Sequence, residues 1–155
     1  MLSFRLMGFG EFQAKAQSLI KDNFEESSSS KGEHKLNVNW PLYQQFIDLN
    51  LLQIVGAFEG QDFVGYAIVI KTPDTWDMGK MSGMVQVMYL KPESRKGMAG
   101  VRLIKFAMNV AKAMECGEIK LYISRRSKSK RKKPISRLAL GLGFTFKEAV
   151  FTKQL

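Results

Sequence analysis

The segment VMYLKPESRKGMAGVRLI, residues 87–104, constrains the fold of this chain more than any other stretch. An apolar run ends at Leu90, a short basic loop with two glycines follows, and an amphipathic pattern begins at once. In that pattern apolar residues recur every three to four positions, as they do on one face of a helix. The sequence therefore predicts a strand that passes directly into a helix through a tight, positively charged loop.

The loop has the composition of an anion-binding site. Gly97 and Gly100 permit close approach of the backbone and dihedral angles that other residues avoid. The unpaired N–H groups at a helix N-terminus lie at the positive end of the helix dipole and bind phosphate groups readily. Arg95 and Lys96 add positive charge beside them. We therefore expect a phosphate or diphosphate here, although the Walker pattern and the dinucleotide pattern G-x-G-x-x-G are both absent.

Patterns elsewhere predict a mixed α+β domain around a central sheet. Expected helices cover residues 10–26 and 40–52, the stretch from the basic loop to residue 117, and residues 134–144. Expected strands cover residues 51–59 and 63–71, which form a hairpin, then 84–91, 118–124 and one or two strands within 144–155. In the second helix we expect Leu42, Phe46 and Leu49 to face the core. A single domain over residues 1–155 is the simplest arrangement for this length.

Positive charge is concentrated in one part of the chain. Residues 95–133 contain thirteen Lys or Arg and two Glu, whereas the formal net charge of the whole chain is +10. Such a cluster indicates an anionic partner, such as phosphate, nucleic acid or an acidic host protein, although a solvated loop that only aids solubility is the alternative. The run at 125–133 lacks aromatic residues, so contacts with nucleic acid would be to phosphate. Its candidate contact residues are Arg125, Arg126, Lys128, Lys130, Arg131, Lys132 and Lys133.

Membrane and metal functions are not expected from this sequence. No stretch approaches the roughly 20 apolar residues of a membrane span, and the N-terminus lacks the apolar core of a signal peptide. The single cysteine, Cys116, cannot form an internal disulfide, so we expect a cytoplasmic protein. His34 stands alone in a polar loop without other ligands at metal-binding spacing, so we expect no metal site.

The strand, the basic glycine loop and the helix together resemble the acetyl-CoA-binding motif of the GNAT N-acetyltransferase superfamily. The family pattern R/Q-x-x-G-x-G/A falls on Arg95-Lys96-Gly97-Met98-Ala99-Gly100, where Arg95 and Gly100 match and Met98 stands at the first glycine position. The hairpin with Gly65 in its second strand, and a short helix ending at Gly143-Phe144, are also similar to the family. The likeness extends from about Trp40 to Leu155, and its compactness is similar to that of divergent members found in bacteriophage genomes.

The resemblance implies a GNAT-like sheet, mixed and mostly antiparallel, with splayed central strands flanked by helices. It implies acetyl-CoA as the cofactor, with the pantetheine arm on the backbone of the strand before the loop and the diphosphate on the loop amides. The cofactor residues implied in this way are Met88, Tyr89, Leu90, Arg95, Lys96, Gly97, Met98, Ala99, Gly100 and Val101.

The catalytic residues that the resemblance would supply are missing. The terminal-helix tyrosine falls on Ala139, and the acidic residue of the central strand falls on Gln86. Gln86 cannot accept a proton, but its amide can orient a water that relays one. Tyrosines in the cleft, or Glu59 near the hairpin turn, are the other candidates for proton transfer, and Trp76 is a candidate for the acceptor side. The four tyrosines are Tyr43, Tyr66, Tyr89 and Tyr122.

Two functions therefore remain open. The absence of an acid and a base favours a binding protein of this fold whose basic run engages nucleic acid or an acidic host protein. Arg95, Gly100 and the amide cradle favour an acetyl-CoA-dependent N-acetyltransferase that acts on an amine of an unknown protein or small molecule, as a monomer or homodimer. Because Arg95, Gly100 and the amide cradle are retained, we expect the enzyme.

Overall fold

A computed structural model describes residues 1–27, 35–74, 76–123, 134–147 and 153. Its strands are β1 (Leu2–Met7), β2 (Leu52–Glu59), β3 (Asp62–Pro73), β4 (Met81–Leu90) and β5 (Glu118–Leu121). Its helices are α1 (Phe9–Lys15), α2 (Gln17–Ser27), α3 (Trp40–Asp48), α4 (Ala99–Ala113) and α5 (Pro134–Gly141), with a single 3-10 turn at Pro92–Ser94.

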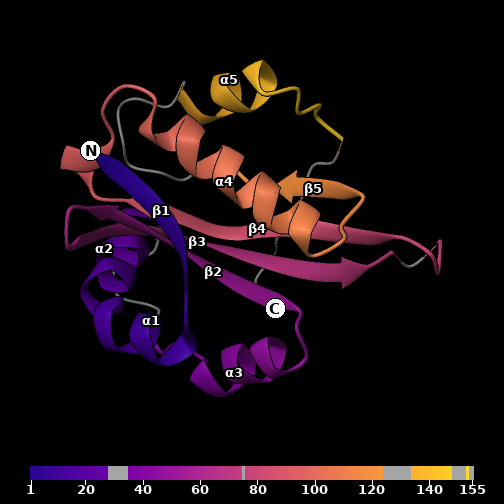
Figure 1. The fold of residues 1–155 in the computed structure, drawn as a ribbon, viewed down its shortest axis with the longest axis horizontal. Coiled ribbons are helices and arrows are strands. Elements are labelled where there is room, and N and C mark those ends of the chain that lie inside the picture. Colours follow the sequence, from indigo (N-terminus) through magenta and orange to yellow (C-terminus); the bar gives the residue numbers. More distant parts are fainter. Residues whose placement is uncertain (28–34, 75, 124–133, 148–152, 154–155) are drawn as a thin grey trace.

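The five strands form one sheet in the order β1-β2-β3-β4-β5. The first three pairings are antiparallel, and β4 and β5 run parallel. Helices α1, α2 and α3 lie on one face of the sheet, and α4 and α5 lie on the other (Figure 1). This arrangement confirms the predicted fold class of a mixed, mostly antiparallel sheet flanked by helices.

Each face of the sheet has its own hydrophobic core. On the α4 face, Leu103 and Ala107 are fully buried against strand residues such as Val55 and Val69. On the opposite face, Phe12 of α1 is fully buried, and its ring meets that of Tyr66 edge-on at a centroid distance of 5.3 Å. Because both faces are covered, the strands read as long apolar runs, and this is why β2 and β3 were easy to predict.

The N-terminal strand and the position of α3 differ from the predictions. Strand β1 was not predicted, although it pairs with β2 along its whole length. The prediction that Leu42 and Leu49 face the core is wrong, because their side chains are 40% and 61% exposed. Helix α3 instead packs through a face shifted around its axis, which contains Trp40, Tyr43, Phe46 and Ile47. On a helix this short, the positions of Leu42 and Leu49 do not determine which face is buried.

Element boundaries also differ. The expected helix over 10–26 is two helices that meet at the fully buried Ala16. Strand β4 begins at Met81 rather than residue 84, so the preceding loop is shorter than predicted. At the C-terminus, residues 144–147 are not a strand, and most of the remaining residues of the predicted strands lie outside the described part of the chain.

Candidate functional site

Strand β4 loses one of its two neighbours halfway along its length. It pairs with β3 from Met81 to Leu90, but β5 accompanies it only over Ser82–Val85. The register between β3 and β4 shifts at this point, since Ile68 faces Val87 while Val69 faces Val85, which leaves Gln86 as an extra residue in a β-bulge. From Gln86 onward, the described strands leave the β5 side of β4 unpaired. The splay expected of the central strands is therefore present.

The turn after β4 leaves amide groups without partners. The described residues provide no hydrogen-bond acceptor for the backbone N–H groups of five residues in the turn and first helical turn, namely Lys96, Gly97, Met98, Gly100 and Val101. The N–H of Ala99 is used locally, because it donates to the carbonyl of Lys96 at 3.2 Å. Free N–H groups at the start of a fifteen-residue helix can bind an anion.

The two glycines of the turn serve different purposes. Gly97 has φ = +56°, a left-handed conformation that most residues avoid, and a Cβ there would meet no atom within 4 Å. Gly100 lies in the first turn of α4, and a Cβ at this position would be 3.8 Å from Cδ1 of Leu138 in α5. Gly97 is therefore required by backbone conformation, whereas a Cβ at position 100 would make only an ordinary contact with Leu138 of α5.

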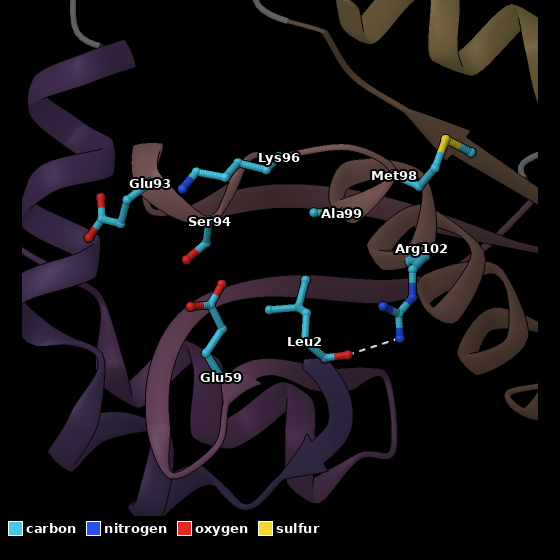
Figure 2. A pocket seen from close by; sticks show the side chains of 8 residues that line it. All are labelled: Leu2, Glu59, Glu93, Ser94, Lys96, Met98, Ala99 and Arg102. Atoms are coloured by element: carbon cyan, nitrogen blue, oxygen red, sulfur yellow. Dashed lines mark hydrogen bonds between the residues drawn. The ribbon is translucent and has the colours of Figure 1, made fainter.

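A hollow of about 250 Å³ lies beside this turn, on the α4 face of the sheet. We call it the loop hollow, and Figure 2 shows the residues that line it, which are Leu2, Glu59, Glu93, Ser94, Lys96, Met98, Ala99 and Arg102. The Arg102 guanidinium donates a hydrogen bond to the Leu2 carbonyl at 2.9 Å. The hydroxyl of Ser94 is buried, has no hydrogen-bond partner among the described residues and points toward the hollow (Figure 2).

The charges in the loop hollow nearly cancel. Lys96 and Arg102 provide two cations, and Glu59 and Glu93 provide two carboxylates. An anion in the hollow would therefore meet as much repulsion as attraction from side chains. Any preference for a phosphate must come from the free N–H groups of the turn rather than from these side chains.

The side chain of Arg95 forms hydrogen bonds with other residues of the protein. Its Nη1 and Nη2 donate to the two carboxylate oxygens of Glu26 in α2 at 2.7 and 2.6 Å, and its Nε donates to the carbonyl of Leu90 at 2.7 Å. Its guanidinium also lies 5.2 Å from the ring centre of Tyr89. The hydrogen bond with Glu26 raises the pKa of Arg95, and its backbone N–H donates to Pro92. The structure thus gives Arg95 partners within the protein.

A second hollow, of about 260 Å³, lies on the opposite face of the sheet. We call it the tyrosine hollow. It is lined by Ile20, Asn23, Phe24, Ser27, Leu36, Val38, Asn39, Tyr43, Tyr66, Ile68 and Val87, none of which is charged. Because Val87 belongs to the part of β4 that has lost β5, this hollow lies beside the unpaired strand segment.

The structure separates the four candidate tyrosines. Tyr43 and Tyr66 line the tyrosine hollow, and burial raises the pKa of both, that of Tyr66 to about 12. The Tyr66 hydroxyl is held by the side-chain amide of Asn23 at 3.1 Å. The Tyr43 hydroxyl has no hydrogen bond to the described residues. Tyr89 is buried beside Arg95, and Tyr122 is half exposed beyond β5, so neither lines either hollow.

Other predicted candidates lie elsewhere. Gln86 is exposed at the bulge and lines neither hollow, so its water-relay role stays a prediction. Glu59 lines the loop hollow, on the other side of the sheet from Tyr43. Trp76 is 97% exposed in the β3–β4 connection and lines neither hollow, so its role on the acceptor side stays a prediction. Ala139, at the position of the family tyrosine, is buried.

The basic run at 125–133 lies outside the described residues, and its role as an anion contact stays a prediction. Within the described residues no three His, Cys, Asp or Glu side chains lie together as a metal site would require. None of the helices in the described part of the chain combines the length and apolar character needed to cross a bilayer.

Sequence reasoning missed three residues of the site: Asn23, Glu26 and Ser94. All three are ordinary surface types in their local context, and nothing in helix periodicity marks them. Their roles depend on segments far along the chain, since Glu26 and Arg95 are 69 residues apart. The sequence signal that could have found Ser94 is its place in the turn between β4 and α4, where buried polar groups are common in binding sites.

Comparisons with known proteins agree with this geometry. No protein-family profile matches the chain, and no curated protein is similar to it in sequence. Solved structures do match. An aminoglycoside acetyltransferase, HMB0005, from an uncultured soil metagenomic sample has a TM-score of 0.77 at 12% identity, covering 100% of this chain and 99% of its own.

Two further structures show the same likeness. Ribosomal-protein-alanine N-acetyltransferase from Brucella melitensis has a TM-score of 0.72 at 12% identity, with 100% and 99% of the two chains covered. A "predicted acetyltransferase" from Clostridium acetobutylicum, solved with acetyl-CoA, has a TM-score of 0.70 at 15% identity, with 99% and 96% covered. The chain therefore has the fold of the GNAT N-acetyltransferases, as the resemblance in its sequence implied.

Proposed function

We propose that this protein is an acetyl-CoA-dependent N-acetyltransferase that acts on a small amine. The observation that supports this most strongly is the set of five N–H groups at residues 96–101 that find no acceptor among the described residues, placed directly after a strand that has lost its neighbour. Free amides of this kind suit a diphosphate, and an unpaired strand edge suits the amide-containing arm of coenzyme A. Solved acetyltransferases of the same fold, one of them with acetyl-CoA, support the same assignment.

In this proposal the cofactor residues act mainly through their backbone. The N–H groups of Lys96, Gly97, Met98, Gly100 and Val101 bind the diphosphate, which needs no side-chain charge. The unpaired edge at Met88, Tyr89 and Leu90 binds the pantetheine arm. The side chains of Tyr89 and Leu90 are buried in the two cores and hold this edge in place.

Acetyl-CoA, when bound, supplies an acetyl group activated as a thioester. The protein must then place an amine against it, remove a proton from the amine and return one to the departing thiolate. Tyr43 is the best candidate proton donor, because it lines the tyrosine hollow and its hydroxyl has no hydrogen bond to the described residues, whereas that of Tyr66 is held by Asn23. Gln86 at the bulge can orient a water that accepts the amine proton.

The tyrosine hollow is the proposed acceptor site, and its lining indicates the class of amine. Among the described residues it has apolar walls with amide and hydroxyl groups and no carboxylate. A polycationic amine would lose its hydration there without gaining a counter-charge. A small amine with an apolar body loses little and buries apolar surface. We therefore expect an uncharged or singly charged acceptor with an aromatic or aliphatic body.

Thermal shift measurements with acetyl-CoA test the cofactor assignment. Acetyl-CoA should raise the melting temperature of the wild type and of Gly100→Ala, since a Cβ at this position meets only Leu138 at an ordinary contact distance. Gly100→Trp should abolish the shift, because an indole fills the space between α4 and α5. If millimolar acetyl-CoA does not change the melting temperature of the wild type, the proposal is wrong.

Turnover then tests the acceptor. Release of free thiol from acetyl-CoA should increase with 2-phenylethylamine and not with kanamycin, a polycation of similar reactivity. The opposite order would place the acceptor outside the tyrosine hollow. No release with any amine, combined with a clear thermal shift, would instead favour the binding protein.

A further inference from the structure

We propose that Arg95 and Glu26 form a link through which the cofactor turn, residues 95–101, sets the position of α2 and so of one wall of the tyrosine hollow. That acetyl-CoA binds at the turn and an amine in the hollow rests on the proposed function. The link itself is a feature of the fold and can be tested without either ligand.

The geometry of the contact fixes orientation as well as distance. Two parallel hydrogen bonds of 2.6 and 2.7 Å join the guanidinium of Arg95 to both carboxylate oxygens of Glu26. On its other side the same guanidinium donates to the Leu90 carbonyl at 2.7 Å and lies over the ring of Tyr89. The guanidinium is therefore fixed on both sides. A shift of the turn moves Glu26 more reliably through such a bidentate pair than it would through a single exposed ion pair.

In the described part of the chain, helix α2 is anchored to the core mainly near its start, where Leu19 is buried and Ile20 packs beside it. Leu19 is its only buried residue, and it lies near the start of the helix. Toward its end, the described residues make two side-chain links from α2 to the sheet side: Asn23 with Tyr66, and Glu26 with Arg95. Elements that bury little apolar surface are the ones that move at low cost.

The end of α2 that is held by these links also forms part of the acceptor site. Ile20, Asn23, Phe24 and Ser27 all line the tyrosine hollow. An anion that orders the cofactor turn will therefore favour one position of Arg95, of Glu26 and of this wall. By linkage, a ligand in the hollow must strengthen cofactor binding by the same factor. Arg95 and Glu26 are thus positioning residues, and we expect a coupling of about fivefold.

Hydrogen exchange measured without any ligand tests the link. Arg95→Met should increase the exchange rate of amides in residues 22–27 by about fivefold. Lys96→Met removes an adjacent cation that makes no hydrogen bond or ion pair with α2 among the described residues, and it should leave that exchange unchanged. Equal exchange in the wild type and Arg95→Met, or equal increases in both variants, would overturn the proposal.

Calorimetric titration with acetyl-CoA tests the coupling. Glu26→Gln should weaken acetyl-CoA binding about fivefold, although Glu26 is on α2 and outside the cofactor turn. The control is Glu25→Gln, because Glu25 is the next residue, is exposed and makes only a 3.9 Å ion pair with Lys21. Acetyl-CoA should also slow exchange in residues 22–27 of the wild type but not of Glu26→Gln.

The outcomes separate the two proposals. If the wild type does not bind acetyl-CoA, the proposed function is wrong, and the ligand-free exchange experiment still decides whether the link exists. If the wild type binds acetyl-CoA and the two Gln variants have equal affinities, the function stands and the coupling is wrong.

Discussion

Gly65 and Tyr89 lie so close across β3 and β4 that a Cβ on Gly65 would come within 2.5 Å of the Tyr89 carbonyl oxygen. It would also come within 2.5 Å of Cδ2 of Leu90, the residue with which Gly65 is in register. The contact with a backbone atom cannot be relieved by rotating a side chain. Gly65 therefore holds β3 tightly against the segment of β4 that we assign to the cofactor.

Gly65→Ala should destabilise the fold and displace the end of β4. Overpacking of this kind costs about 2–3 kcal/mol, which for a chain of this length lowers the melting temperature by roughly 5–10 °C. The matched control is Gly10→Ala in α1, where a Cβ meets no atom within 4 Å and where alanine favours the helix. Thermal unfolding of both variants checks the prediction, and equal melting temperatures would contradict it.

Gly97 allows the backbone effect to be isolated from any steric effect. An L-residue in the left-handed region costs roughly 1–2 kcal/mol, and asparagine tolerates it better than alanine. Because a Cβ at this position meets no atom within 4 Å, Gly97→Ala should weaken acetyl-CoA binding about tenfold and Gly97→Asn clearly less. Calorimetry gives both affinities. If alanine and asparagine weaken binding equally, conformation of the turn is not the cause.

The buried hydroxyl of Tyr66 should make the stability of the fold decrease with rising pH in the alkaline range. Burial raises its pKa in the folded protein to about 12, whereas an unfolded tyrosine titrates near 10. Between these values the unfolded chain loses the proton first, so the stabilisation present below pH 10 is lost as the pH rises toward 12. The free energy of unfolding of the wild type should therefore fall by about 1 kcal/mol more than that of Tyr66→Phe between pH 9 and 11.

Urea unfolding at the two pH values measures this difference. Tyr122→Phe serves as the control, because the Tyr122 side chain is half exposed, and it should follow the wild type. A wild type and a Tyr66→Phe variant with parallel pH dependence would show that the Tyr66 hydroxyl is not buried as described.

Tyr43→Phe tests the proposed proton donor while keeping the ring that packs against Trp40. Loss of a general acid typically lowers kcat by about 100-fold or more, and the affinity for acetyl-CoA should not change, since Tyr43 is not among the residues assigned to cofactor binding. Steady-state kinetics with 2-phenylethylamine and calorimetry measure the two quantities. An unchanged kcat would show that Tyr43 is not the proton donor and that water protonates the departing thiolate.

The sequence by itself determined the local units of this protein. The strand, the glycine turn and helix α4 follow from an apolar run, from residues suited to unusual backbone angles and from helical periodicity, all of which act between near neighbours. The hairpin of β2 and β3 was predicted on the same grounds, with Gly60 at φ = +61° in its turn. The free N–H groups before α4 were predictable too, because every helix start leaves such groups unpaired.

The tertiary structure decided which of these units meet. Three features of the site depend on segments that are far apart in the chain. Strand β5 separates from β4 after Val85, and Tyr43 and Tyr66 share a hollow that Tyr89 does not line. The third feature is the contact between Arg95 and Glu26. Strand β1 was missed for the same reason, since its pairing with β2 and not its own pattern defines it. Local preferences act through neighbouring residues, whereas the partners of a side chain depend on how whole segments pack.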